Sequence, residues 1–500
     1  MFRSIARPSL LRSSLRYKHI TLRRHASELS VANFSKPSPF GQPFFPSHPD
    51  LVKQNEVTPG IALSEYKSRR RRLIDSLPES SIVISTAGTV KYMSGEIFYK
   101  FRQASDFWYL TGCQEQESAI IIEKTGSSHR TTLFCRGKDA AREQWEGSRT
   151  DFEAAASVFG VDEVKSIDQL PSSMKALISN HTYVYADSSS SSRRSRHRNM
   201  LQLLSNPADQ SDYEKIIGSL PQTRRRSLAP EVGKMRSIKS EAEQLIMRQA
   251  AKISGRAHAK TMRFAQPGMS EYALAAHFEY ACALDGSQRP AYVPVVASGA
   301  NALIIHYTSN DQRIRDNELV LIDAGCEYNG YASDITRTFP ANGKFTPAQH
   351  DLYSAVLSAQ KELINQCTED KQLSLDALHR NSCTLLRREL NQLGFRLSSG
   401  ELERILYPHY LSHPVGIDLH ESQFFSRGEP IKEGMVITIE PGIYVPPSSQ
   451  FPKHFHNIGI RIEDEVLVKR NFPIVLSIEA PKEISDIEGA CQGLLEQSKI

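Results

Sequence analysis

Residues 319–340 read LVLIDAGCEYNGYASDITRTFP, and this stretch decides how the C-terminal half of the chain folds. Its first four residues are apolar and predict a buried strand that ends on Asp323, where a carboxylate can project into a cleft. Asn329-Gly330 is a two-residue hairpin signal. If these two residues form the loop, Asp323 faces Thr336, and Asp334 is its diagonal neighbour on the same face at roughly 7–8 Å. Two carboxylates this close repel each other unless a cation lies between them.

Two further strand ends carry acidic residues. The apolar run before Glu440 is broken by Pro441-Gly442, so Glu440 also lies at the end of a strand. Farther on, isoleucines at alternate positions place Arg461 and Glu463 together on the polar face of a strand. Arg461 is therefore predicted to orient the neighbouring carboxylates. The sequence thus predicts a cluster of four carboxylates: Asp323, Asp334, Glu440 and Glu463.

A histidine cluster supplies a nitrogen ligand for the same site. His409 and His413 lie in PHYLSH, residues 408–413, and His420 follows. One neutral imidazole with four carboxylates is an oxygen-rich ligand set that favours Mn²⁺ over Co²⁺, Zn²⁺ or Fe²⁺. Two such ions roughly 3.5–4 Å apart share a hydroxide and polarise a scissile carbonyl group. Spacing alone leaves a second interpretation open, in which these residues form structural ion pairs.

The composition of the chain changes along its length. With 500 residues it is too long for one hydrophobic core, so more than one domain is expected. Residues 1–27 form a leader, and residues 28–57 form a Pro- and Ser-rich extended linker. Helices and strands then alternate over residues 58–230, which predicts an α/β domain, whereas their mixed order over 231–500 predicts an α+β domain.

Apolar periodicity predicts the individual elements of both domains. In the N-terminal domain, a basic helix at 66–77 precedes strands at 82–84, 107–110, 119–122 and 131–135. In the C-terminal domain, Ser240 and Glu243 form a capping box that starts one helix, and Ser270 starts a second that ends at Leu284. The remaining predicted elements are strands at 319–322, 331–338, 435–439 and 458–462 and helices at 351–366 and 375–393.

The leader has the composition of a mitochondrial transit peptide, although a disordered basic tail is the alternative. Residues 1–27 contain six Arg, Lys18, interspersed leucines and no acidic residue, so they carry a charge of +7. The whole chain carries +5, so the remainder carries −2, which gives no support for nucleic-acid binding. Seven scattered cysteines without CxxC spacing fit the reducing mitochondrial matrix. Since no uncharged apolar run reaches the roughly 20 residues of a membrane span, only peripheral association with the inner membrane stays open.

At these motifs the chain resembles the aminopeptidase P (Xaa-Pro aminopeptidase, peptidase M24B) family of metal-dependent peptidases. The matching segments are IHYT (305–308), LIDAGCEY (321–328), DITRTFP (334–340), IEPGIY (439–444) and NIGIRIED (457–464). Upstream, FRQASDFWYLTG (101–112) resembles the N-terminal domain of that family. The resemblance covers roughly residues 58–485 and implies a pita-bread catalytic domain preceded by an α/β N-terminal domain.

The resemblance implies a role for each residue of the metal site. Asp323 chelates one ion, Asp334 and Glu463 bridge both ions, and His413 with Glu440 holds the other ion. Glu440 also takes the proton from the metal-bridging hydroxide as the hydroxide attacks the substrate. The implied enzyme is a metalloaminopeptidase, a hydrolase that acts on peptide and protein N-termini with two divalent ions per subunit, and the expected assembly is a homodimer.

The resemblance also implies which residues contact the substrate. His306 and His420 hydrogen-bond the scissile carbonyl and the developing oxyanion. His409 lines the pocket for the second residue of the substrate, and Tyr292 contacts the substrate.

The chain departs from the family signature at the ligand histidine. That signature runs His-x-Leu-Gly-Leu-Asp-Val-His-Asp, whereas residues 413–421 read HPVGIDLHE. Both histidines are present. Pro414 and Glu421 are expected to alter the pocket wall, which weakens the expectation that proline is preferred in the second position of the substrate.

Two short segments resemble the mitochondrial branch of the family, which comprises the fungal intermediate-cleaving peptidases of 55 kDa and the animal Xaa-Pro aminopeptidase 3 group. These segments are EQWEG (143–147) and LYPHY (406–410). The resemblance implies removal of a single N-terminal residue, namely Tyr, Leu or Phe, from imported proteins after presequence cleavage. Two alternatives stay open: a general Xaa-Pro aminopeptidase for peptides with proline in second position, and an inactive pita-bread module that binds proteins. The intact ligand set argues against the inactive module.

Overall fold

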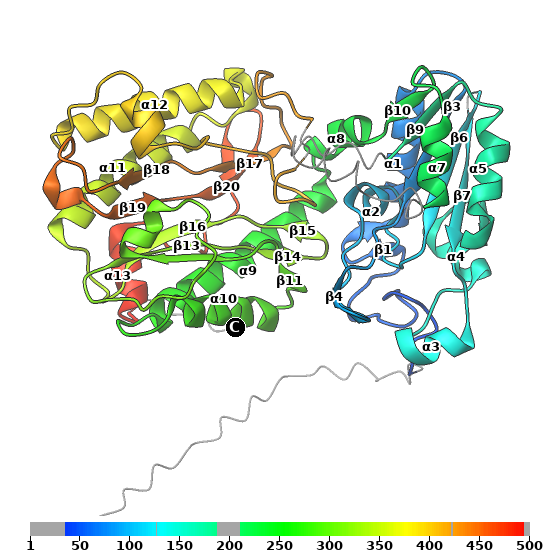
Figure 1. The fold of residues 1–500 in the computed structure, drawn as a ribbon, viewed down its shortest axis with the longest axis horizontal. Coiled ribbons are helices and arrows are strands. Elements are labelled where there is room, and N and C mark those ends of the chain that lie inside the picture. Colours follow the sequence, from blue (N-terminus) through cyan, green and yellow to red (C-terminus); the bar gives the residue numbers. More distant parts are fainter. Residues whose placement is uncertain (1–35, 127, 188–210, 422–423, 495–500) are drawn as a thin grey trace, which may run out of the picture.

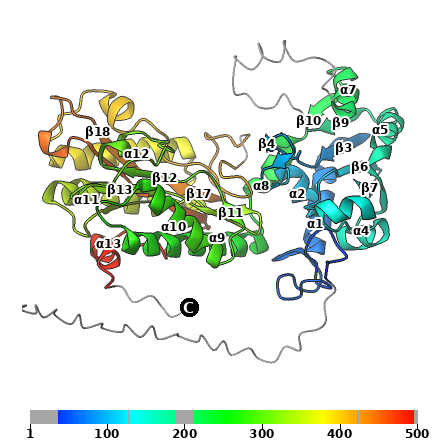
Figure 2. The ribbon, with the colours of Figure 1, turned by 60° about the horizontal axis from the view of Figure 1, so that its bottom comes forward.

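The computed structural model describes residues 36–494 apart from 127, 188–210 and 422–423. It contains an N-terminal unit and a C-terminal unit that lie side by side, with helix α8 (Ala229–Ser237) between them (Figures 1 and 2). The predicted leader, residues 1–27, lies outside the described residues.

A six-stranded mixed sheet forms the centre of the N-terminal unit. Its strand order is β10-β9-β3-β6-β7-β8, with β10-β9, β9-β3 and β7-β8 parallel and the other pairs antiparallel. The predicted strands near residues 82, 119 and 131 are confirmed. The six strands are β3 (Ser81–Thr86), β6 (Ala119–Thr125), β7 (Ser128–Cys135), β8 (Glu163–Ser166), β9 (Tyr183–Ala186) and β10 (Arg225–Ser227).

Helices cover both faces of this sheet because both faces of its strands are apolar. Ile82 and Ile84 belong to the cluster with α5 and α7, and Val83 belongs to the cluster with α1 and α4. A strand covered on both faces is apolar at consecutive positions, as β3 is at Ile82, Val83 and Ile84. The elements around the sheet are β1 (Glu56–Thr58), β2 (Ile61–Ala62), α1 (Leu63–Ser76), β4 (Tyr92–Ser94), β5 (Ile97–Phe98), α3 (Ala140–Glu146), α4 (Phe152–Phe159), α5 (Leu170–Ile178) and α7 (Asp212–Ser219).

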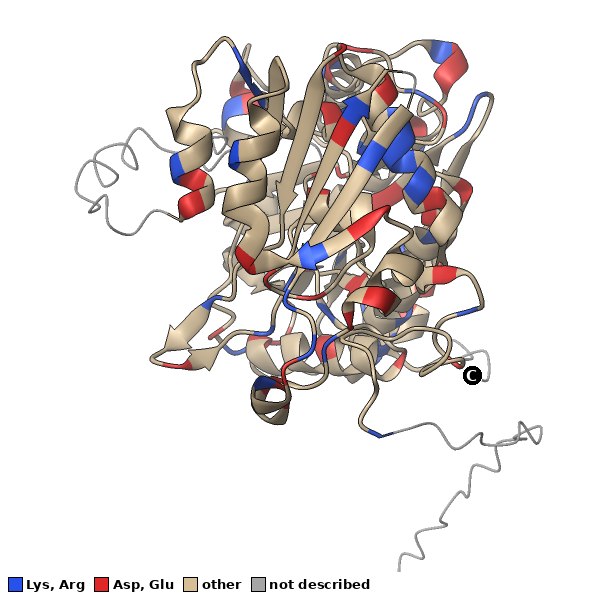
Figure 3. Ribbon diagram, turned by 90° about the vertical axis from the view of Figure 1, so that its right-hand side faces the viewer, with Lys and Arg blue, Asp and Glu red and all other residues tan. Residues whose placement is uncertain are grey.

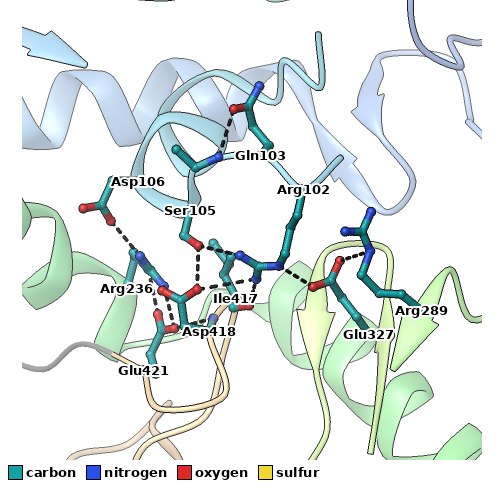
Figure 4. Close-up of polar contacts among 11 residues, drawn as sticks. Arg102, Gln103, Ser105, Asp106, Arg236, Arg289, Glu327, Ile417, Asp418 and Glu421 are labelled. Carbon is teal, nitrogen blue, oxygen red and sulfur yellow. Dashed lines mark hydrogen bonds and ion pairs between the residues drawn. The ribbon is translucent and has the colours of Figure 1, made fainter. Parts of the chain in front are cut away.

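Helix α2 (Ser105–Thr111) corrects the sequence prediction of a strand at 107–110. Every residue from Phe107 to Thr111 is buried. A short apolar run buried on all sides has no periodicity that separates a helix from a strand. The helix ends at Gly112, whose φ of 70° is the left-handed conformation of a C-cap. Its first turn faces the C-terminal unit (Figure 4).

The described end of the predicted linker is not extended. Phe44 and Val52 are buried against the N-terminal unit. The Gln42 side-chain amide also donates to the carbonyl oxygen of Gly112 at 3.0 Å. The packed part of this unit therefore begins before residue 58, because apolar side chains between the prolines supply a local core.

The C-terminal unit places short sheets between two pairs of long helices (Figure 1), which confirms the predicted α+β class. Helices α9 and α10 lie on one side, and α11 and α12 lie on the other. The predicted capping box of Ser240 and Glu243 starts α9. The helices are α9 (Glu241–Phe264), α10 (Glu271–Leu284), α11 (Pro347–Ile364), α12 (Leu375–Gln392) and α13 (Ile484–Cys491).

All strand pairs of the C-terminal unit are antiparallel among the described residues. The sheets have the orders β12-β13-β16, β11-β14-β15, β17-β20-β21 and β18-β19. The strands are β11 (Arg289–Pro290), β12 (Val295–Ser298), β13 (Leu319–Asp323), β14 (Cys326–Tyr328), β15 (Tyr331–Ala332), β16 (Thr336–Pro340), β17 (Val436–Ile439), β18 (Gly442–Val445), β19 (Ile458–Arg461), β20 (Asp464–Val468) and β21 (Pro473–Val475).

The strand predicted at 331–338 is divided into β15 and β16. Asp334 lies between them and donates its backbone N–H to the buried carboxylate of Glu465. This side-chain partner comes from β20, so the interruption depends on a long-range contact that periodicity does not reveal.

In the described part of the chain, every helix is too short or too polar to cross a lipid bilayer.

Lys and Arg segments alternate with Asp and Glu segments over the N-terminal unit (Figure 3).

Candidate metal centre

The hairpin around Asn329-Gly330 brings two aspartates together. β13 and β16 pair with Asp323 opposite Thr336, which is the predicted register. The turn residues have φ values of 48° and 85°, and a two-residue type I′ turn requires positive φ at both positions. The hydroxyl oxygen of Tyr292 lies 2.6 Å from one carboxylate oxygen of Asp323 and 2.6 Å from one of Asp334.

Arg461 and Glu463, at the end of β19, meet this hairpin at Thr336. The Thr336 hydroxyl donates to Glu463 at 2.6 Å and accepts from Nε of Arg461 at 3.1 Å. The same guanidinium donates to Asp323 at 2.6 Å and to the Tyr444 hydroxyl at 2.8 Å. Arg461 therefore holds the Asp323 carboxylate in one orientation.

His413 turns one ring nitrogen toward the carboxylates. Its Nδ1 lies 3.1 Å from the carbonyl oxygen of Pro414, and since a carbonyl only accepts, Nδ1 carries the proton of the neutral ring. Its Nε2 lies 3.3 Å from Asp334 and 3.6 Å from Glu440. Glu440 follows β17 and accepts from the Thr438 hydroxyl at 3.1 Å. The ligand atoms of Asp334, His413 and Glu463 all lie within 4.8 Å of one another.

Burial and mutual repulsion perturb the ionisation of these groups. Burial, followed by the Asp334, Glu440 and Asp323 charges, raises the pKa of Glu463 well above its usual value. Burial likewise raises the pKa of Glu440 to about 7. Burial alone would lower the pKa of His413, but the adjacent Asp334 and Glu440 outweigh it and raise that pKa to about 9. The site therefore retains protons when no other cation neutralises it.

This donor set fits divalent cations. Four largely buried carboxylates face the Arg461 guanidinium, so negative charge is in excess among the described residues at this point. Nε2 of His413 also points at carboxylate oxygens of Asp334 and Glu440, so a cation that displaced its proton would be held by this nitrogen and these carboxylates together. Carboxylates with one imidazole suit Mn²⁺ among the transition metals.

One cavity of about 570 Å³ brings together all ten predicted site residues. Tyr410 and Arg427 are among the lining residues that were not predicted, and Arg427 stacks over the Tyr410 ring at 4.1 Å. No spacing in the sequence links them. The predicted residues that line the cavity are Tyr292, His306, Asp323, Asp334, His409, His413, His420, Glu440, Arg461 and Glu463.

Tyr444 connects two of the predicted residues and was also missed. Its hydroxyl lies 3.0 Å from Nε2 of His409 and accepts from Arg461 at 2.8 Å. The Nδ1 of His409 lies 2.9 Å from the carbonyl oxygen of Tyr410, which fixes the ring. The sequence does contain a signal for Tyr444. Residues 440, 442 and 444 alternate along the chain, so Tyr444 on β18 is expected on the same face as Glu440.

The loop that carries His306 is held by a buried carboxylate. Glu271, the first residue of α10, accepts from the Ser298 backbone N–H at 2.7 Å and from Asn301 at 2.9 Å. Its other oxygen accepts from the Tyr307 hydroxyl, next to His306, at 2.9 Å. Loop and helix are thereby fixed to each other, which sets the position of His306 in the cavity.

Pro414 and Glu421 do not line the cavity themselves, so they form no part of its wall. Glu421 is only 2% exposed and points toward Arg236 (Figure 4). Nε of Arg236 donates to Glu421 at 2.8 Å. Glu421 thus acts behind the cavity, whereas its neighbour His420 faces into it.

Comparison with known proteins agrees with this geometry. Residues 246–470 match metallopeptidase family M24, and residues 66–185 match the aminopeptidase P N-terminal domain. Intermediate cleaving peptidase 55 of Saccharomyces cerevisiae is 39% identical over 476 residues, covering 94% of this chain and 92% of its own length. The crystal structure of that yeast protein without its N-terminal 58 residues superposes with a TM-score of 0.78 at 38% identity, over 88% of this chain and 100% of the other.

Two further relatives match over nearly the whole chain. Mitochondrial intermediate cleaving peptidase 55 of Arabidopsis thaliana is 38% identical, with 90% of this chain and 87% of the relative covered. Xaa-Pro aminopeptidase 3 of Rattus norvegicus is 35% identical, with 90% of each chain covered. The α/β N-terminal domain and the pita-bread catalytic domain are those of this family. The chain therefore belongs to metallopeptidase family M24 and is a metalloaminopeptidase, a hydrolase of the aminopeptidase P type.

Proposed function

We propose that this metalloaminopeptidase works with two divalent metal ions, Mn²⁺ being the favoured metal. The convergence of four largely buried carboxylates and Nε2 of His413 on one cavity carries this proposal. Asp323 would hold one ion, His413 and Glu440 would hold the other, and Asp334 and Glu463 would serve both. The five proposed ligands are Asp323, Asp334, His413, Glu440 and Glu463.

The bound ions would supply Lewis acidity, which polarises the scissile carbonyl and lowers the pKa of water. The chain's own residues do the rest. A carboxylate oxygen of Glu440 accepts the proton of the attacking water. The rings of His306 and His420, in the same cavity, donate hydrogen bonds to the scissile carbonyl as it becomes an oxyanion. Tyr292 contacts the substrate, and His409 lines the pocket for its second residue.

We propose that the substrates are proteins imported into mitochondria, from which the enzyme removes one N-terminal Tyr, Leu or Phe after presequence cleavage. The yeast and Arabidopsis relatives are named intermediate cleaving peptidases, which supports action on processing intermediates, and the Arabidopsis name supports the mitochondrial location. A second candidate, a general Xaa-Pro aminopeptidase, is favoured by the name of the rat relative.

Peptides beginning Tyr-Ala, Leu-Ser and Ala-Pro distinguish the two candidates. We expect the enzyme with Mn²⁺ to release the first residue from Tyr-Ala and Leu-Ser peptides, and a chelator to abolish the activity. Cleavage of the Ala-Pro peptide alone would support the second candidate instead. Asp334→Ala should abolish activity, whereas Asp351→Ala, an exposed aspartate on α11, should not change it. Activity that is unaffected by chelator, or that survives Asp334→Ala, would contradict the metal mechanism.

A further inference from the structure

A buried arginine lies between the two units, directly behind the metal centre. Arg236, near the end of α8, has a side chain that is 5% exposed. Its guanidinium donates to Glu421 through two nitrogens, at 2.8 and 2.7 Å. It also donates to Asp418 at 2.6 Å and to Asp106 at 2.6 Å (Figure 4). We call Arg236 with Asp106, Asp418 and Glu421 the Arg236 clamp.

The N-terminal unit adds direct bonds to the same loop. The Ser105 hydroxyl, on α2, donates to Asp418 at 2.6 Å. Arg102 donates to the carbonyl oxygen of Ile417 at 2.7 Å and to Glu327 at 2.7 Å (Figure 4). Asp418 is therefore held by Arg236 on one carboxylate oxygen and by Ser105 on the other.

The loop of residues 413–421 is folded around the Glu421 carboxylate. The Asp418 backbone N–H donates to that carboxylate at 2.9 Å, and the Glu421 backbone N–H donates to the Pro414 carbonyl at 2.9 Å. A side chain on Gly416 would come within 2.7 Å of the carboxylate, so the loop closes this tightly only with glycine there. Its two histidines stand at either end, with ring centroids 4.3 Å apart.

We propose that Arg236 is a positioning residue for the reaction, through which the N-terminal unit holds His413 and His420 in place at the metal centre. The inference rests on the proposed function, because it assigns the two rings to the metal ion and the oxyanion. Neither Arg236 nor its carboxylate partners line the cavity, so the clamp acts through the loop. A planar guanidinium has five donors in a fixed fork, which is why one side chain can orient three carboxylates at once.

Glu421→Gln tests the Arg236 clamp, and Ser105→Ala tests the direct bond from the N-terminal unit to Asp418, one of the acids of the clamp. Glu421→Gln keeps the length of the side chain but replaces one of the two carboxylate oxygens that bind Arg236. Ser105→Ala removes a single hydroxyl of the N-terminal unit and leaves its helix intact. Ser85→Ala is the matched control, since the buried Ser85 hydroxyl donates to Asp187 at 2.8 Å within the N-terminal unit.

With saturating Mn²⁺ and the best peptide, we expect Glu421→Gln to lower kcat on the order of 10- to 100-fold with KM changed less than twofold. Ser105→Ala should lower kcat by about threefold to tenfold. The kcat of the double variant should lie within about twofold of that of Glu421→Gln alone, because both substitutions act through the same loop. Ser85→Ala should keep the wild-type kcat. A wild-type kcat for Glu421→Gln, or effects that multiply in the double variant, would overturn the proposal.

Hydrogen exchange of the peptide that contains residues 413–421 gives a readout without metal or substrate. Exchange should be faster in Glu421→Gln and in Ser105→Ala and unchanged in Ser85→Ala. Unchanged exchange in both Glu421→Gln and Ser105→Ala would refute the inference. Absence of wild-type activity on every peptide with Mn²⁺ would instead refute the proposed function, so the two failures are distinguishable.

Discussion

The Arg461 guanidinium binds three different partners with its three nitrogens. Nε, Nη1 and Nη2 donate to Thr336, Tyr444 and Asp323, respectively. The group is buried, so each partner depends on it for a hydrogen bond that water does not replace. One side chain therefore connects a proposed metal ligand to the residue that contacts His409.

Arg461→Lys should lower activity on the order of 10- to 100-fold although it keeps the charge. A lysine ammonium is a point charge on a flexible chain and does not match three partners in one plane. Metal affinity should fall as well, because the Asp323 carboxylate loses its fixed orientation. Peptidase assays and Mn²⁺ titration measure both effects.

The control for this substitution is Arg404→Lys, which changes an exposed arginine of the same unit. It should leave kcat and metal affinity unchanged. Wild-type activity and affinity in Arg461→Lys would show that charge alone is sufficient at this position.

Much of the site could be predicted residue by residue because its signals are local. The Asn329-Gly330 turn and the period of two fix which side chains share a face, so the opposition of Asp323 and Thr336 followed from the sequence. The partner of Glu421 could not be predicted from the sequence, because Arg236 is 185 positions away and no periodicity relates the two residues.

At the scale of elements, the hairpin of β14 and β15 does more than align two aspartates. Its turn extends to the N-terminal unit, where Gly330 faces the indole ring of Trp108 on α2. A Cβ atom on Gly330 would lie 2.6 Å from a Trp108 ring atom, closer than any real contact. The turn therefore requires glycine for its positive φ and for the space that the indole occupies.

Gly330→Ala should lower the free energy of unfolding by about 2–4 kcal/mol. The control is Gly268→Ala, because Gly268 has a similar φ of 92° but open space around it. For Gly268→Ala the free energy of unfolding should fall by only about 1–2 kcal/mol, the cost of a residue with a Cβ atom at a positive φ. Urea denaturation of both variants measures the difference, and equal losses would show that Trp108 adjusts to the new methyl group at no cost.

Helices and strands were predicted correctly where their apolar pattern extends over many residues, and wrongly where it is short. Helices α9 to α12 have capping residues and several turns of apolar periodicity, so their positions were readable from the sequence. Helix α2 has seven residues, five of them buried, and its run of apolar residues fits a strand equally well. The gap between β15 and β16 depends on Glu465, which reaches Asp334 from another sheet.

At the scale of the whole molecule, His258 of α9 is a neutral histidine buried beside Ala324, the residue that follows Asp323. Nε2 of His258 donates to the carbonyl oxygen of Ala324 at 2.9 Å, and its Nδ1 has no hydrogen-bond partner among the described residues. Burial, with help from the Arg337 charge, lowers the pKa of His258 to about 3. The folded protein therefore leaves this ring unprotonated at a pH where the unfolded chain protonates it.

Stability should fall as pH falls below about 6.5, since only the unfolded chain gains a proton on His258 until the pH nears 3. At pH 5 this one ring should cost about 2 kcal/mol relative to pH 8. His258→Gln removes the titrating ring. Between pH 8 and pH 5 the free energy of unfolding of this variant should therefore fall by about 2 kcal/mol less than that of the wild type. Denaturation with chelator present measures it, and His350→Gln, at an exposed histidine, is the control. Equal pH dependence of His258→Gln and wild type would contradict the burial of a neutral ring.

The Arg236 clamp has a consequence for how such enzymes diverge. Both histidines of the active-site loop belong to the C-terminal unit, yet the loop is fastened to Ser105 and Arg102 of the other unit. An exchange of N-terminal domains between relatives would therefore preserve every proposed metal ligand and still lower kcat. Activity would be kept only if α2 of the new domain could bind Asp418 of the loop as Ser105 does.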